Sequence, residues 1–162
     1  MTEPTRAFDL QDFLPYVLNQ AAEELSRGFQ VVYRTRYGMT RTQWRVLANL
    51  GKFGAMTARD ICAISHVEKT KVSRAVAALE QAQMLTREVS SKDRRAEVLS
   101  LTESGKAVFA ELGQLGVAFD AQLRDRLGEA EAKQLIALLG RLVDLSPRKA
   151  TGAGTDPDDP AS

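Results

Sequence analysis

Cysteine and histidine are almost absent from this chain, which has one of each in 162 residues. A lone cysteine cannot form an internal disulfide, and no zinc-ligand spacing can be built from the pair. The chain also lacks a glycine-rich phosphate loop and a nucleophile–base motif, so scattered carboxylates are the only candidates for catalysis. The sequence therefore predicts a protein that is not an enzyme and that has no metal site and no cofactor.

Long apolar runs are also missing. No stretch approaches the roughly 20 apolar residues that a membrane-spanning helix needs, and the N-terminus lacks the basic and apolar regions of a signal peptide. Together with the cysteine content, this predicts a soluble, cytoplasmic protein without a membrane partner.

Charge of one sign is not in excess, since the formal net charge is only +1. Its distribution is more informative than its sum. From Glu68 to Arg95, seven basic and four acidic side chains leave a local charge of +3. This segment is therefore the candidate surface for an anionic partner.

Apolar residues recur at spacings of three and four along most of the chain, which predicts a mainly helical protein. The pair Thr40 and Gln43 is a capping-box pattern, and Thr57 with Asp60 is a second helix start. We also expect Ser65 and Glu68 to form a capping box. The predicted helices cover about 10–37, 41–50, 58–64, 67–83, a stretch of about 25 residues after Thr102 that is bent or broken near Gly113 and Gly116, and a final helix after Gly128.

The helix predicted at 67–83 has two unlike faces. We expect Val72, Ala75, Val76 and Leu79 to anchor it in the core. Two strands are predicted to follow, at Leu85–Val89 and Glu97–Leu101, joined by a charged loop. This order is typical of a helix-turn-helix with a β-wing, in which one element reads the major groove of DNA and the other lies beside it. The exposed face of the helix holds Lys69, Thr70, Lys71, Ser73 and Arg74.

Three sequence segments together resemble the MarR (multiple antibiotic resistance regulator) family over residues 10–145. The run TKVSRAVAALEQAQMLTREVSSKDRRAEVLSLTESG is similar to its recognition helix and wing, QWRVLANL to its second helix, and GEAEAKQLIALLGRL to its last helix. The resemblance implies a homodimer whose terminal helices interleave across a two-fold axis. The wide apolar faces of residues 10–33 and 131–145 favour this pairing, although such faces can also fold onto their own domain.

The predicted fold class is therefore mainly α with a small β-wing. We expect one domain at 10–145 between a flexible N-terminus (1–9) and a disordered tail (146–162). Within it, a winged helix-turn-helix at about 40–101 is flanked by dimerisation helices at about 10–37 and 103–145.

The resemblance assigns this chain the role of a DNA-binding transcriptional regulator. We interpret Arg74 as a reader of guanine, because its fork matches O6 and N7. Thr70 and Ser73 suit phosphates or base edges, and Lys69 and Lys71 suit phosphates. The alternative is a winged-helix module that binds a protein and no DNA, but the polar, basic face counts against it.

The charged loop between the two predicted strands, at the tip of the wing, is expected to make a second contact with DNA. We expect Arg95 to enter the minor groove, where negative potential attracts arginine, and Arg94 to take this part if the hairpin register differs by one. A shift of one residue in strand register would exchange the two, so the choice stays open. Asp93 is expected to orient the arginine by holding its guanidinium.

The resemblance also implies a small aromatic or phenolic effector that relieves repression. The candidate pocket residues are Tyr33, Arg36, Tyr37 and Trp44, with Phe29 and Phe53 nearby. Aromatic residues with an arginine beside them can hold an aromatic carboxylate, although aromatics at helical spacing are more often core.

Overall fold

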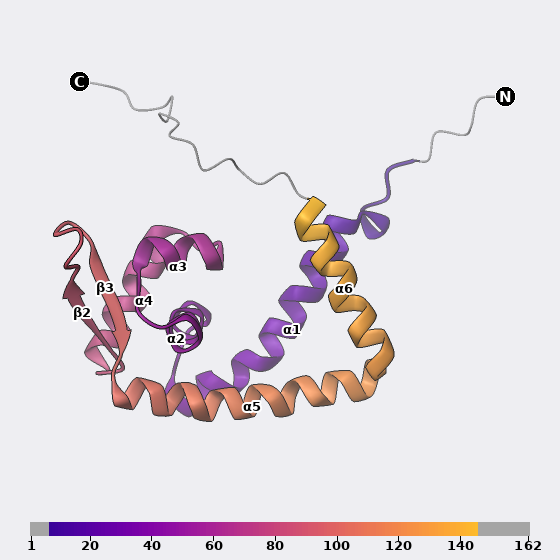
Figure 1. Cartoon of the computed structure of the whole chain (residues 1–162). Coiled ribbons are helices and arrows are strands. Elements are labelled where there is room, and N and C mark those ends of the chain that lie inside the picture. Colours follow the sequence, from indigo (N-terminus) through magenta and orange to yellow (C-terminus); the bar gives the residue numbers. More distant parts are fainter. Residues whose placement is uncertain (1–6, 146–162) are drawn as a thin grey trace, which may run out of the picture. The chain divides into compact units, whose positions relative to one another are not determined.

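The computed structural model describes residues 7–145, so the predictions for residues 1–6 and 146–162 lie outside the described part. The predicted fold class is confirmed: helices dominate and one small sheet is present (Figure 1). The chain forms two compact units, residues 1–120 and 121–162. In chain order the elements are the 3-10 helix η1 (Leu10–Asp12), α1 (Leu14–Tyr37), α2 (Arg41–Phe53), β1 (Met56–Thr57), α3 (Ala58–Ser65), α4 (Lys69–Gln81), β2 (Leu85–Val89), β3 (Glu97–Leu101), α5 (Glu103–Leu127) and α6 (Glu129–Leu145).

Local capping sets the helix boundaries in and around the winged helix-turn-helix. At the start of α2, the Gln43 backbone N–H donates to Thr40 Oγ1 at 3.2 Å, and the Gln43 side chain accepts from the Thr40 N–H at 3.0 Å. The same reciprocal pair joins Thr57 and Asp60 at the start of α3. Gly38 ends α1 in the left-handed region, with a φ of 63°, which glycine adopts without steric cost.

The start of α4 differs from the prediction. The expected capping box between Ser65 and Glu68 is wrong, because α4 begins only at Lys69 and Glu68 makes no side-chain cap. Ser65 remains in α3, where its Oγ accepts a hydrogen bond from the Asn49 side chain of α2 at 3.1 Å. His66 then ends α3 in the left-handed conformation.

Helix α5 runs without interruption through Gly113 and Gly116, so the predicted break is wrong. An isolated glycine weakens a helix but does not stop it when neighbouring residues are packed. A Cβ at Gly116 would make an ordinary contact with the Phe29 ring of α1 at 3.5 Å, and one at Gly113 would meet no neighbouring atom within 4 Å. Packing therefore does not require glycine at either position.

The sheet has three antiparallel strands in the order β1-β3-β2. The predicted strands β2 and β3 are confirmed and pair from Leu85↔Leu101 to Val89↔Glu97. Strand β1 was not predicted. Its two residues pair with β3, and a strand of that length carries no alternating pattern for sequence reasoning to detect.

One apolar core holds the first unit together. It takes side chains from α1, α2, α3, α4, the sheet and α5, so the recognition helix and the base of the hairpin rest on one packed body. Cys62 is half-buried and packs against it. The buried residues are Tyr33, Met39, Val46, Leu47, Leu50, Ile61, Val72, Ala75, Val76, Leu79, Leu85, Leu99, Val108 and Leu112.

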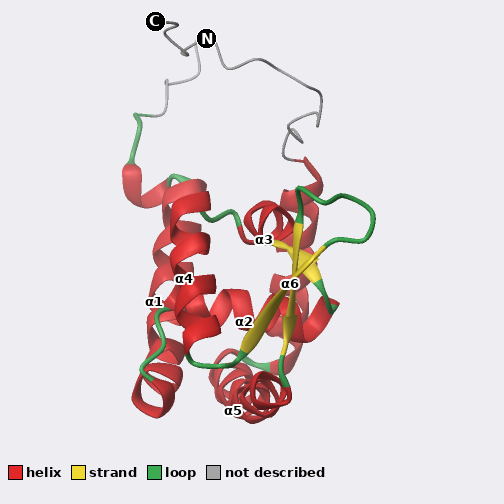
Figure 2. Ribbon diagram, turned by 90° about the vertical axis from the view of Figure 1, so that its left-hand side faces the viewer, coloured by secondary structure: helices red, strands yellow, loops and turns green. Residues whose placement is uncertain are grey.

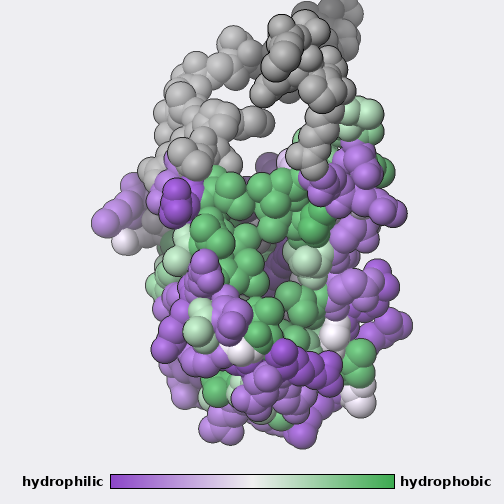
Figure 3. All heavy atoms as spheres, turned by 90° about the vertical axis from the view of Figure 1, so that its right-hand side faces the viewer, coloured by the Kyte–Doolittle hydropathy of each residue, from purple (hydrophilic) through white to green (hydrophobic). Residues whose placement is uncertain are grey.

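The second unit has almost no core of its own. It comprises the end of α5 and all of α6, and Ala132 is the one buried residue within its described side chains, 121–144. Apolar side chains reach the surface on the face shown in Figure 3. On α6 the exposed large apolar residues are Leu135, Ile136, Leu138, Leu139 and Val143. In the first unit, α1 separately exposes Leu14, Tyr16, Val17, Leu25 and Val31.

Between residues 7 and 145, no helix is long and apolar enough to cross a membrane.

Candidate nucleic-acid interface

Helix α4 divides its side chains between the core and the surface. The four residues predicted to face inward, Val72, Ala75, Val76 and Leu79, are all buried. The apolar side packs α4 against α2 and α3, so the opposite side is left at the surface. That exposed side carries the predicted residues Lys69, Thr70, Lys71, Ser73 and Arg74.

The first helix of the helix-turn-helix, α3, is capped at its start. Asp60 accepts hydrogen bonds from the Thr57 hydroxyl at 2.7 Å and from the Thr57 backbone N–H at 3.0 Å. These bonds lower the pKa of Asp60, so the carboxylate keeps its charge at the positive end of α3. His66 then turns the chain with a φ of 52°. The Thr57–Asp60 cap therefore sets where α3 begins, His66 ends it, and packing of both α3 and α4 on α2 holds the two helices in place.

The beginning of α2 lies close to the exposed face of α4. A hollow of about 230 Å³ between them is lined by Lys71, Arg74 and Ala75 of α4 together with residues at the start of α2. Lys71 lies 3.7 Å from Glu68 and is 64% exposed, so this weak ion pair leaves its ammonium accessible. Those at the start of α2 are the N-cap Thr40 and the helix residues Thr42 and Gln43.

The tip of the hairpin is ordered by side chains that bind backbone. Ser90 Oγ accepts from the N–H groups of Lys92 and Asp93, at 3.2 and 3.4 Å. Asp93 Oδ1 accepts from the Arg95 N–H at 2.9 Å. The interpretation that Asp93 holds the Arg95 guanidinium therefore changes, because its carboxylate closes the turn through the backbone. Arg94 and Arg95 are both exposed at this tip, whose loop stands out in Figure 2.

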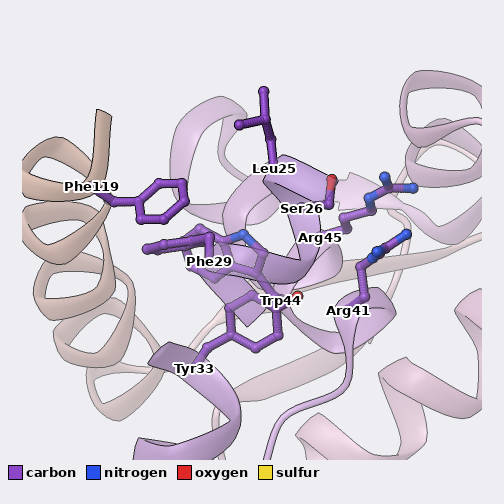
Figure 4. A pocket seen from close by; sticks show the side chains of 9 residues that line it. Leu25, Ser26, Phe29, Tyr33, Arg41, Trp44, Arg45 and Phe119 are labelled. Atoms are coloured by element: carbon purple, nitrogen blue, oxygen red, sulfur yellow. The ribbon is translucent and has the colours of Figure 1, made fainter. Parts of the chain in front are cut away.

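A second feature lies between α1, α2 and α5. It is a hollow of about 330 Å³, and aromatic rings form much of its wall (Figure 4). Phe29 contacts Tyr33, Trp44 and Phe119 edge-on or tilted, with ring centroids 5.5–5.7 Å apart. Tyr33 stacks on Trp44 at 5.8 Å. The remaining lining residues are Leu25, Ser26, Arg41, Arg45 and Gly116.

Two arginines face this hollow from the first turns of α2. Arg41 donates two hydrogen bonds to Glu23 of α1, at 2.8 and 3.1 Å. These bonds lower the pKa of Glu23, so the pair is charged over a wide pH range. Arg45 lies one helical turn further along α2, beside Trp44 (Figure 4). The cations at the hollow are therefore residues that sequence reasoning did not select.

The four predicted pocket residues are divided between two places. Tyr33 and Trp44 line the hollow, whereas Arg36 and Tyr37 do not. Both of these bind the Glu111 carboxylate of α5, through the Arg36 guanidinium and the Tyr37 hydroxyl, and the bond to Glu111 raises the pKa of Tyr37. Phe53 lies outside the hollow as well and is 54% exposed. Arg36 and Tyr37 therefore fasten the end of α1 to α5.

An exposed polar helix preceded by a tight turn and followed by a projecting hairpin defines a winged helix-turn-helix DNA-binding protein. Residues 37–96 match the sequence profile of the MarR family. The HTH-type transcriptional repressor MdtR of Bacillus subtilis (strain 168) is 32% identical over 107 residues, which are 66% of this chain and 69% of that protein. The chain belongs to the MarR family of transcriptional regulators.

Two solved structures support the assignment. A MarR/EmrR family transcriptional regulator from Acinetobacter sp. ADP1 superposes with a TM-score of 0.75 at 26% identity, covering 85% of this chain and 96% of that one. The MarR family transcriptional regulator SPO1453 from Silicibacter pomeroyi DSS-3 gives a TM-score of 0.74 at 27% identity, covering 85% and 97%. All three relatives are transcriptional regulators.

Proposed function

We propose that this chain is a homodimeric repressor that binds a pseudo-palindromic operator and is released from it by a small aromatic or phenolic anion. The observation that carries the DNA-binding part is the exposed, hydroxyl-bearing and cationic side of α4, opposite a side that is fully buried. One face anchors the helix while the other is left for the major groove.

The roles of the side chains follow from their chemistry. Arg74 makes the forked contact to guanine, and Thr70 and Ser73 bind base edges or phosphates. Lys69 and Lys71 neutralise phosphates as flexible point charges. At the wing, Arg94 or Arg95 enters the minor groove, and Asp93 supports it by closing the turn.

Two copies are proposed because the second unit cannot bury its apolar side chains alone. A short helical unit with one buried residue in its described part needs a partner surface. Isologous pairing is the commonest solution and would place two α4 helices on half-sites about one DNA turn, roughly 34–36 Å, apart. The dimerisation helices would be α1, α5 and α6.

A gel shift with the DNA that flanks this protein's own gene tests the proposal. We expect saturable binding at modest salt that survives excess non-specific competitor and weakens linearly in a plot of log affinity against log salt. Absence of saturable binding, with or without aromatic acids, would remove the DNA-binding assignment and leave the alternative of a protein-binding winged helix.

The hollow between α1, α2 and α5 is the proposed effector site. Its aromatic wall suits an aromatic ring, and its two arginines suit an anionic group. Arg41 is already bound to Glu23 through two hydrogen bonds. Arg45 is therefore the residue we assign to the carboxylate or phenolate of the ligand.

Replacing Arg45 with methionine is expected to weaken binding of 4-hydroxybenzoate about tenfold or more, because a hydrogen bond to a charged group contributes roughly 1.5–3 kcal/mol. Trp44 is the only tryptophan of the chain and lines the hollow, so its fluorescence reports occupancy directly. The matched control is Arg36→Met, which removes an arginine outside the hollow and should leave the titration unchanged. Equal losses in the two variants, or binding unaffected by Arg45→Met, would contradict this site.

A further inference from the structure

The inner face of the hairpin changes character along its length. Leu85 at the base and Leu99 in the middle of the hairpin are each 1% exposed and belong to the core. On the same face, Arg87 stands directly opposite Leu99, and the next pair towards the tip is Val89 with Glu97, of which Val89 is 65% exposed. The half of the hairpin that carries the wing tip therefore has little apolar packing beneath it.

The guanidinium of Arg87 connects this less packed half of the hairpin to α4. Arg87 of β2 donates through Nε to Glu80 Oε2 of α4 at 2.9 Å, and through Nη1 to Glu97 Oε2 of β3 at 3.3 Å. Glu80 lies in the last turn of α4, so a single side chain connects the recognition helix with both strands of the hairpin. Because the guanidinium is planar and uses two different nitrogens, the connection fixes a direction as well as a distance.

The electrostatics favour a persistent connection. The Arg87 side chain is 32% exposed, and burial acts to lower its pKa. The bonds to Glu80 and Glu97 outweigh burial, so the pKa of Arg87 is raised and the group stays charged. An ion pair of this exposure adds little to the folding free energy, because water screens it. We therefore expect the ion pair to affect the orientation of the hairpin relative to α4 more than the stability of the fold.

The orientation of the hairpin matters because a small rotation at Arg87 causes a larger displacement at the tip. The tip lies about five residues beyond Arg87, or roughly 16 Å at about 3.3 Å per residue. A rotation of about 10° at Arg87 would move the tip by roughly 3 Å, which is more than a hydrogen bond or a groove contact tolerates.

We propose that Arg87 is a positioning residue that sets the spacing between the major-groove helix α4 and the wing tip. It acts through Glu80 and Glu97 and makes no contact with DNA itself. This inference rests on the proposed function, since the spacing matters only when both elements bind one DNA duplex.

The test compares footprints of wild type and Arg87→Met on operator DNA obtained from the gel shift. We expect Arg87→Met to keep the protection of guanine N7 in the major groove and to lose hydroxyl-radical protection in the minor groove, with affinity falling about tenfold. Arg87→Lys can reach one glutamate but not fork between two, so its footprint should be intermediate. Thermal unfolding should shift little in either variant.

A double-mutant cycle separates positioning from direct contact. The cycle includes one wing arginine. It is the one of Arg94 and Arg95 whose replacement by alanine alone lowers the affinity for DNA more. If Arg87 acts through the wing, adding Arg87→Met to that variant should cost almost nothing further. Additive losses would overturn the proposal and make Arg87 a DNA contact in its own right.

The charge swap Glu80→Arg with Arg87→Glu gives a second criterion. It rebuilds the link between α4 and β2 and should recover part of the minor-groove protection, whereas a lost phosphate contact would not recover. If wild type itself protects no DNA, the proposed function fails. If wild type binds and Arg87→Met gives the same footprint and affinity, only this inference fails.

Discussion

The variant Ile136→Asp should dissociate the proposed dimer and lower its affinity for a two-half-site operator by roughly 10²–10⁴-fold, the range in which a linked second site strengthens binding. Ile136 lies on α6 and is 56% exposed in the single chain. Leu139 and Val143 follow at helical spacing on the same side. A carboxylate placed within this stripe would have to be buried against the partner without a counter-charge, which is strongly unfavourable.

The control is Ala137→Asp, which adds the same charge at the next position, about 100° around the helix from both Ile136 and Leu138 and outside the apolar face. It should remain a dimer and bind the operator as the wild type does. Mass measured by light scattering across a concentration series, and affinity for one and for two half-sites, check both variants. A dimeric Ile136→Asp with undiminished operator binding would show that α6 is not the interface.

This experiment also tests the domain interpretation made from sequence. The wide apolar face of residues 131–145 was compatible with dimerisation or with folding onto the same chain. Loss of the dimer in Ile136→Asp would select the first alternative, and an unchanged dimer would select the second. Cooperative reading of two half-sites depends on that interface.

The recognition helix could be predicted from sequence because its determinants are local. Apolar residues at spacings of three and four specify which side of α4 is buried, and period and length suffice for β2 and β3. The capping residues Thr40 and Thr57 bind groups only three positions away. None of these features needs knowledge of how distant segments meet.

The hollow could not be predicted in the same way. Arg36 and Tyr37 are next to the aromatic cluster in sequence, but Glu111, 75 and 74 residues away, holds them elsewhere. Phe119 joins the aromatic wall from α5, which is far from α1 in sequence. A useful signal was available in α2, where Arg41 and Arg45 flank Trp44 at spacings that place all three on one side of a helix.

At the wing tip, Asp93 was predicted to have an orienting role, but the contact predicted for it was wrong. Asp93 was expected to bind a guanidinium, and it binds the backbone N–H of Arg95 two positions on. Asp side chains commonly make this bond in turns, so the local rule decides the contact. The consequence for function is similar, because a closed turn keeps Arg94 and Arg95 at the tip.

Replacing Arg74 with alanine should remove discrimination at one base pair of each half-site, at a cost of roughly 1–3 kcal/mol, or about 5- to 150-fold. Lys71→Ala is its counterpart on the same helix face. It should weaken all sequences evenly and reduce the slope of log affinity against log salt by about one. Both residues line the same hollow beside the start of α2, so position alone does not separate their roles.

The measurement is a set of operators that carry each base substitution in turn, titrated with both variants at several salt concentrations. Both side chains are exposed, so neither variant should unfold at a notably lower temperature. If the two variants lost the same specificity and the same salt slope, Arg74 would be a second phosphate contact. Base reading would then fall to the hydroxyls of Thr70 and Ser73, whose single-point contacts discriminate less sharply than a fork.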